Sequence, residues 1–232
     1  WINRDNLLLD MHQLEEDMER DYYVSDDWSI EFYVLQATRG FIAVSAQNYL
    51  LPQLQRSYCL LEFQNLAIPK RIAKTLDQYT LSFNTSFPDV MHAIHAYHEE
   101  KSWLSPQYQD LCERMHVKGP IILTLDKVNC RFQLVSIALF KNTTHELVAG
   151  EIGYTIGKTY TSLTGFCMRE KKISIGKIQI LKLAKFLECN GYDFMNLGQP
   201  PMGDVMKYKA ELGGIEVSRS EFLKKWNVST CS

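Results

Sequence analysis

The chain has 232 residues, of which 46% are hydrophobic and 22% are charged. These values are ordinary for a globular protein that is long enough to bury one large core. The formal net charge of −2 excludes a protein that coats nucleic acid through bulk electrostatics, although it leaves room for one local basic face.

Six cysteines are scattered along the sequence without a CxxC pair, and no signal peptide is visible. We therefore expect reduced thiols and a cytoplasmic location. A closed zinc site needs clustered ligands, so we expect no metal. The longest apolar run is far shorter than the roughly 20 residues that span a bilayer, so we also expect no membrane partner.

The first 78 residues are predicted to form a small N-terminal subdomain. Residues 5–20 carry apolar side chains at helical spacing with acids between them, which predicts one amphipathic helix. A second helix is expected to start from Ser25 or Asp26 as the N-cap and to stop at Gly40. Short strands are expected at residues 41–45 and 58–63.

The main domain is predicted to cover residues 79–232 and to begin with a strand followed by two helices. The first helix is expected to follow Ser86 and to run to about Lys101. The second is expected between Ser105, with Pro106 at its first position, and Gly119.

Three histidines, His92, His95 and His98, lie on the first of these helices. Residues three apart lie on the same side of a helix, but His92 and His98 are six apart and do not. No carboxylate or cysteine nearby would complete a set of metal ligands. The spacing therefore does not favour a metal site.

The rest of the chain alternates strands and helices. An antiparallel meander is expected to turn at Gly157-Lys158, and helix, strand, helix, strand and helix follow it. This order predicts an α+β (α/β) fold with one core. The expected strands are 132–140, 146–156, 159–167, 192–197 and 215–218, and the expected helices are 174–190, 204–212 and 219–226.

A basic loop comes directly before the helix at 174–190. Backbone amides at a helix N-terminus next to cations form an anion site, although a solvated lysine-rich loop would show the same composition. The residues that predict the site are Arg169, Lys171, Lys172, Ser174 and Lys177.

Three motifs in this order resemble one known family. They are "WLSP" from Trp103, "AGEIGYTIGKTYTSLTGF" from Ala149 and "LGGIEVSRSEFL" from Leu212. Their order and spacing resemble the leucyl/phenylalanyl-tRNA–protein transferases over about residues 79–226. The resemblance implies a GNAT-like fold, in which a mixed, mainly antiparallel sheet is flanked by helices.

The resemblance also implies a reaction. An amino acid would pass from the 3′ end of an aminoacyl-tRNA to the N-terminal amine of an acceptor protein, which is then marked for degradation. No cofactor is implied. Ester aminolysis needs a proton acceptor for the amine and donors for the tetrahedral oxyanion.

The aminoacyl pocket implied by the resemblance departs from the family at two positions. The family's acid falls at Leu163, and an apolar family position falls at Glu151. These two changes compensate each other or retune the pocket toward a polar or cationic side chain. The implied pocket residues are Trp103, Glu151, Tyr160, Ser162, Leu163, Thr164, Gly165, Phe166 and Met195.

The implied catalytic residues are Asn196, at the position of a family Asp, and Gln199, one residue beyond the family Gln. An amide is a much poorer base than a carboxylate, so we expect both residues to orient and donate. Two alternatives therefore stay open: an altered member that binds without transfer, and an acyltransferase that uses another donor.

Overall fold

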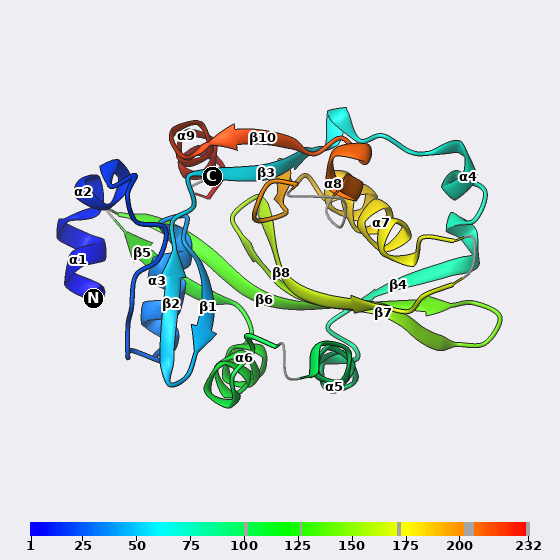
Figure 1. The fold of residues 1–232 in the computed structure, drawn as a ribbon, viewed down its shortest axis with the longest axis horizontal. Coiled ribbons are helices and arrows are strands. Elements are labelled where there is room, and N and C mark those ends of the chain that lie inside the picture. The colour runs from blue at the N-terminus through cyan, green and yellow to red at the C-terminus, as the bar shows by residue number, and fades with distance from the viewer. Residues whose placement is uncertain (100–101, 126, 171–172, 202–206, 231–232) are drawn as a thin grey trace.

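The computed structural model describes residues 1–99, 102–125, 127–170, 173–201 and 207–230. One eight-stranded sheet runs through the molecule in the order β10-β3-β9-β8-β7-β6-β4, with β5 beside β6 (Figure 1). All neighbouring strands are antiparallel except β8 and β9. The strands are β3 (Ser57–Glu62), β4 (Tyr79–Phe83), β5 (Ile121–Leu125), β6 (Val128–Lys141), β7 (Glu146–Ile156), β8 (Thr159–Cys167), β9 (Phe194–Asn196) and β10 (Ile215–Ser218).

Helices cover both faces of this sheet and enclose two hydrophobic clusters. Side chains of α3 (Ile30–Thr38), α5 (Phe87–His98) and α6 (Pro106–Lys118) belong to the first cluster. Side chains of α7 (Ile175–Cys189) belong to the second. In Figure 1, α5 and α6 lie on one side of the sheet and α7 on the other. The α+β fold with a mainly antiparallel sheet is therefore confirmed.

The remaining elements surround this core. A hairpin of β1 and β2 forms a second, two-stranded sheet near the N-terminus. Among the described residues, no helix is long and apolar enough to cross a membrane. The bounds are α1 (Arg4–Leu9), α2 (Met11–Glu16), β1 (Ile42–Ala46), β2 (Tyr49–Gln53), η1 (Phe63–Asn65), α4 (Lys70–Ala73), η2 (Leu76–Gln78), α8 (Lys207–Glu211) and α9 (Arg219–Thr230).

Strand β3 precedes residue 78 in the sequence but lies between β10 and β9 in the large sheet. Its central residues Tyr58–Leu61 are fully buried there. The predicted N-terminal subdomain therefore shares its sheet with the rest of the chain, and the division at residue 78 stays a prediction.

The helix predicted over residues 5–20 is two short helices. Asp10 closes α1 by donating its N–H to Asn6 O at 2.9 Å, and it is also the residue from which α2 starts. Its φ of −111° and ψ of 13° are not helical. A short acidic side chain favours such a capping position over a helix interior, and this preference divides the predicted helix.

The N-cap of α3 is Ser29, so the prediction of Ser25 or Asp26 is wrong. The Ser29 hydroxyl accepts from Phe32 N at 3.2 Å. Ser25 is instead tied to β2, where its backbone N–H and C=O both pair with Leu50 at 2.9 Å. Gly40 ends the helix as predicted, with φ of +87°, a conformation that favours glycine.

Helix α6 confirms its predicted ends: Ser105 accepts from Tyr108 N and Gly119 is the C-cap. Helix α5 ends at His98, before the predicted end at Lys101, which lies outside the described residues. Of the helix predicted at 204–212, the structure describes only the part from Lys207 onward.

Candidate functional site

The sheet opens where β8 runs past the end of β9. The two strands pair in parallel only over Thr159–Thr161, against Phe194–Asn196. Further along β8 the register against β7 shifts, since Gly153 faces Ser162 while Ile152 faces Thr164. Such a bulge bends a strand away from its neighbours. Residues 162–167 of β8 therefore form an edge that β9 does not cover, which we call the open edge.

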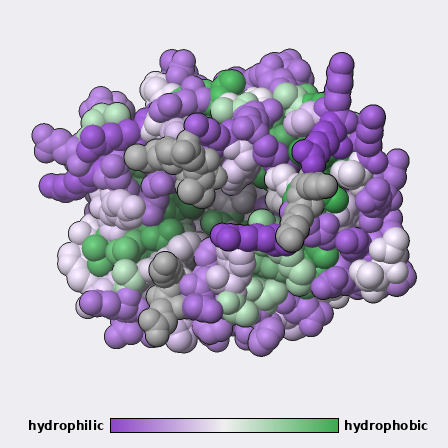
Figure 2. Space-filling model, turned by 45° about the vertical axis from the view of Figure 1, so that its right-hand side comes forward, coloured by the Kyte–Doolittle hydropathy of each residue, from purple (hydrophilic) through white to green (hydrophobic). Residues whose placement is uncertain are grey.

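The backbone groups that point out from the open edge follow from strand alternation. Met168 N donates to Val148 O of β7 at 2.8 Å. Since alternate residues of an antiparallel strand bond to the same neighbour, Phe166 also faces β7 with its backbone groups. Gly165 and Cys167 then direct theirs away from β7, toward the opening. Figure 2 shows a hollow in one face of the molecule, bordered by both hydrophobic and hydrophilic side chains.

A buried carboxylate lies beside this edge. Glu151 of β7 is only 6% exposed. The Tyr160 hydroxyl donates to one of its oxygens, and Gln179 Nε2 of α7 donates to the other at 2.8 Å. Burial raises the pKa of Glu151, while hydrogen bonds from Tyr160, Gln179 and Ser162 oppose the rise. The carboxyl group of Glu151 thus connects β7 to both β8 and α7.

Two glycines make room for this carboxyl group. A Cβ on Gly153 would lie 2.3 Å from the Tyr160 hydroxyl oxygen, and one on Gly165 would lie 2.8 Å from Glu151 Cβ. The Gly-rich spacing of the motif therefore has a packing cause. Tyr208 of α8 also faces the group: burial and the charge of Glu151 help raise its pKa to about 12.

Of the two predicted catalytic amides, Asn196 ends β9 and Gln199 lies in the loop that follows, and the two differ in exposure. Asn196 is fully buried, and its Oδ1 accepts from Gly198 N at 2.9 Å. Its Nδ2 has no hydrogen-bond partner in the part of the chain that is described. Gln199 is exposed. Asn196 therefore offers one free donor, and neither amide can accept a proton at neutral pH.

Lys209 of α8 is hydrogen-bonded to the loop that follows β9. Its buried ammonium donates to Leu197 O and Gln199 O, each at 2.7 Å. Burial lowers the pKa of Lys209. Sequence reasoning missed this residue, because nothing local distinguishes it from a solvated lysine.

The predicted pocket residues divide between the two faces of the sheet. Tyr160 and Met195 pack in the α7 cluster, whereas Trp103, Leu163 and Phe166 pack in or against the α5–α6 cluster. Within the described part of the chain, these side chains therefore belong to two clusters and not to one.

Individual positions follow from this division. Trp103 lies edge-on to Tyr108, with ring centroids 5.0 Å apart. Ser162 bonds to Glu151, and Thr164 and Gly165 meet a histidine instead.

That histidine is His98, the last residue of α5. Its Nε2 lies 2.9 Å from Gly165 O and 3.5 Å from Thr164 Oγ1. His92 and His95 are exposed, so the three histidines do not converge. Sequence reasoning weighed His98 only as a metal ligand, because a contact between residues 67 apart leaves no local pattern.

Only some residues of the predicted anion-binding loop are exposed and could contact an anion. Lys177 forms an ion pair with Glu211 of α8, while Arg169 and Ser174 are exposed. Ser174 is the N-cap of α7 but makes no side-chain capping bond. Lys171 and Lys172 lie outside the described residues.

One amide of this helix N-terminus is already engaged. The thiol of Cys167 accepts a hydrogen bond from the backbone of Gly176, although burial still raises the pKa of this thiol.

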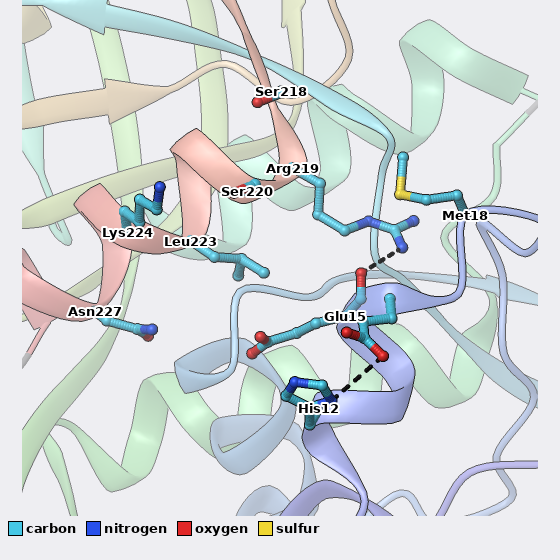
Figure 3. A pocket seen from close by; sticks show the side chains of 10 residues that line it. His12, Glu15, Met18, Ser218, Arg219, Ser220, Leu223, Lys224 and Asn227 are labelled. Carbon is cyan, nitrogen blue, oxygen red and sulfur yellow. Dashed lines mark hydrogen bonds and ion pairs between the residues drawn. The ribbon is translucent and has the colours of Figure 1, made fainter.

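A separate pocket of ≈ 390 Å³ lies between α2 and α9 (Figure 3). Arg219, at its wall, donates to backbone carbonyls of Glu15, Asp17 and Gln55. None of the residues predicted for the site lines this pocket, which lies away from the open edge. Its lining comprises His12, Glu15, Glu16, Met18, Ser218, Arg219, Ser220, Leu223, Lys224 and Asn227.

An open strand edge beside an imidazole and a hydroxyl, with a buried amide at the end of the neighbouring strand, suits acyl transfer, because such a reaction needs donors for an oxyanion and a path for a proton. The family model described as leucyl/phenylalanyl-tRNA protein transferase matches residues 60–227, from β3 to α9. The chain belongs to this family, whose name defines an aminoacyltransferase.

Three solved structures have a similar arrangement of elements. They are L-PGS from Bacillus licheniformis (11% identity, TM-score 0.47, 98% of this chain and 71% of that one), FemX (9%, 0.44, 92% and 74%) and a tandem GNAT protein from the clavulanic acid biosynthesis pathway (11%, 0.39, 94% and 71%). A comparison with curated proteins gives no match.

Proposed function

We propose that this protein transfers an amino acid from the 3′ end of a tRNA to the N-terminal amine of an acceptor protein. The observation that carries the proposal is the family match, which spans residues 60–227 and contains the open edge, Asn196 and the loop after β9. By the same membership, the amino acid is leucine or phenylalanine, and the acceptor begins with a basic residue. The product would enter a degradation route that reads protein N-termini in the cytoplasm.

The chemistry is aminolysis of an ester. The acceptor amine attacks the ester carbonyl, and the resulting oxyanion needs hydrogen-bond donors placed in advance. We propose Asn196 Nδ2 as one such donor, because it has no hydrogen-bond partner among the described residues. Exposed Arg169, close to the N-terminus of α7, supplies a positive charge for a tRNA phosphate.

The side chain of the transferred amino acid would meet mainly apolar surface. Both oxygens of Glu151 already accept hydrogen bonds within the core, from Tyr160 and Gln179. A carboxyl group whose two oxygens already accept hydrogen bonds attracts a cationic side chain only weakly. Glu151 therefore contributes to the shape of the site and not to its charge. We therefore propose that replacing the apolar family residue by Glu151 does not by itself change the class of amino acid carried.

The test is a transfer assay with a panel of labelled aminoacyl-tRNAs. The acceptors are a peptide with an N-terminal Arg and the same peptide with its amine acetylated. We expect label only in the free-amine peptide, with the leucyl and phenylalanyl donors. The absence of transfer from every aminoacyl-tRNA, despite tRNA binding, would contradict the proposal and favour a binding protein. Transfer from an acyl thioester alone would favour an acyltransferase with another donor.

A further inference from the structure

We propose that His98 is a catalytic residue that accepts the proton of the attacking amine. This inference rests on the proposed aminoacyl transfer and names the group that carries its proton. It starts from the position of His98 at the open edge of β8, 2.9 Å from the carbonyl oxygen of Gly165.

The imidazole is held at the open edge by its neighbours. His98 is the last residue of α5, and Glu99 ends the helix with a φ of 49°. The ring of Tyr97 packs edge-on against the imidazole, with centroids 5.0 Å apart. Because the Gly165 carbonyl points away from β7, its contact with His98 lies on the side where β9 is absent.

The contact with Gly165 also fixes the tautomer. A carbonyl oxygen can only accept, so Nε2 of His98 must carry the hydrogen of this bond. In a neutral imidazole the other nitrogen, Nδ1, is then the acceptor. A backbone carbonyl thus orients the ring and leaves Nδ1 ready to take a proton, as a positioned general base requires.

Other titratable groups around the open edge are less suited to this task. Glu151 is buried, with both oxygens hydrogen-bonded, and Lys209 uses its protons to hold two carbonyls. Burial raises the pKa of Tyr208 to about 12 and also raises that of the Cys167 thiol. Within the described residues around this edge, His98 is the group whose Nε2 contacts the edge while its second ring nitrogen, Nδ1, makes no hydrogen bond.

The step balances without any further reagent. The amine nitrogen attacks the ester carbonyl carbon, the C–N bond forms, and the amine proton passes to Nδ1 of His98. The tetrahedral intermediate then collapses, the C–O bond to the ribose breaks, and the same proton passes from His98 to the leaving oxygen. One amide and one free hydroxyl result, and the imidazole returns to its initial state.

The experiment compares His98→Gln with His92→Gln and His95→Gln in the transfer assay. The two controls change exposed histidines on the same helix, and a glutamine at 98 keeps an N–H that reaches the Gly165 carbonyl. We expect kcat to fall by about 10²-fold or more for His98→Gln, the usual contribution of a general base, with KM for aminoacyl-tRNA nearly unchanged. Both controls should keep the wild-type rate.

A second measurement separates proton transfer from a structural role. Added imidazole should restore transfer by His98→Ala in proportion to its concentration, and it should not accelerate the controls. A wild-type rate for His98→Gln, or a folded His98→Ala that imidazole does not rescue, would overturn the role of His98. If the wild type itself transfers nothing, the proposed function fails, and this result is distinct from a failure of His98 alone.

Discussion

The ammonium of Lys209 lies 2.7 Å from the carbonyl oxygen of Gln199, and at the same distance from that of Leu197. Helix α8 therefore fixes the loop that leaves β9, which follows Asn196 directly and carries Gln199. Cys59 supports the loop from β3, since its N–H donates to Gly198 O at 2.8 Å. Three successive carbonyls of this loop are thus held from two other elements.

Replacement of this lysine by methionine should impair catalysis more than substrate binding. Lys209→Met leaves the carbonyls of Leu197 and Gln199 without their donor. A displacement of about 1 Å at a reacting group can cost 10²-fold in rate, so we expect kcat to fall at least ~10-fold with a smaller change in KM. Single-turnover transfer measures the effect. Lys209→Gln, which keeps an N–H donor, should retain more activity, and the exposed Lys185→Met should match the wild type. Equal rates for Lys209→Met and the wild type would show that the loop holds its shape unaided.

A glutamine at position 151 should stabilise the protein increasingly as pH rises. Burial raises the pKa of Glu151, so the folded state favours the protonated carboxyl. The stability linked to this group is therefore fully present below the ordinary carboxyl pKa of about 4.3 and is lost as pH rises through the folded value. Glu151→Gln cannot ionise, and a flip of the Gln179 amide keeps its hydrogen bond.

The measurement for Glu151→Gln is the thermal midpoint from pH 5 to pH 8. We expect the variant to gain on the wild type across this range, whereas Glu188→Gln, on the exposed surface of α7, should give a constant difference. A gain that shrinks with rising pH would mean that Glu151 is held as a carboxylate.

The sequence predicted the ends of helices well where one residue type determines the backbone conformation. Gly40 and Gly119 have positive φ and end their helices as expected. Strand β2 was not predicted; Pro52 lies within it and pairs with Ala43 of β1, although proline is uncommon inside strands. Strand β5 was also not predicted, although it pairs with β6 over Ile121–Leu125.

From the sequence, only contacts within the β7–β8 hairpin of the candidate site could be predicted. Glu151 and Tyr160 lie on the two strands of the β7–β8 hairpin, where the Tyr160 hydroxyl donates to Glu151, and both belong to one motif of the sequence. Gln179 and His98 join this region from α7 and α5, through contacts between residues 28 and 67 apart in sequence. No pattern within a single segment encodes such contacts, because the packing of helices on the two faces of the sheet creates them.

Two serines that precede proline-containing helices should differ in their value to stability. Ser105 accepts from Tyr108 N at 3.3 Å, whereas Ser86 makes no side-chain capping bond to α5. Ser105→Ala should therefore lower the free energy of unfolding by about 1 kcal/mol, the usual contribution of an N-cap, and Ser86→Ala should change it by much less. Urea unfolding measures both variants. A larger loss for Ser86→Ala would show that the capping geometry does not govern these two helices.

Removal of the buried Arg219 should be among the most destabilising changes in the chain. Its guanidinium is 2% exposed and donates to carbonyls of both the N-terminal segment and the turn after β2. Arg219→Met leaves these buried carbonyls without donors, and breaking a buried charged network costs about 3–5 kcal/mol. We expect a loss of that size in urea unfolding, together with faster hydrogen exchange in residues 15–21. The control is Lys224→Met, an exposed lysine on the same pocket wall (Figure 3), which should stay within about 0.5 kcal/mol of the wild type. A loss below about 1 kcal/mol for Arg219→Met would mean that packing of α9, and not this arginine, holds the N-terminal segment in place.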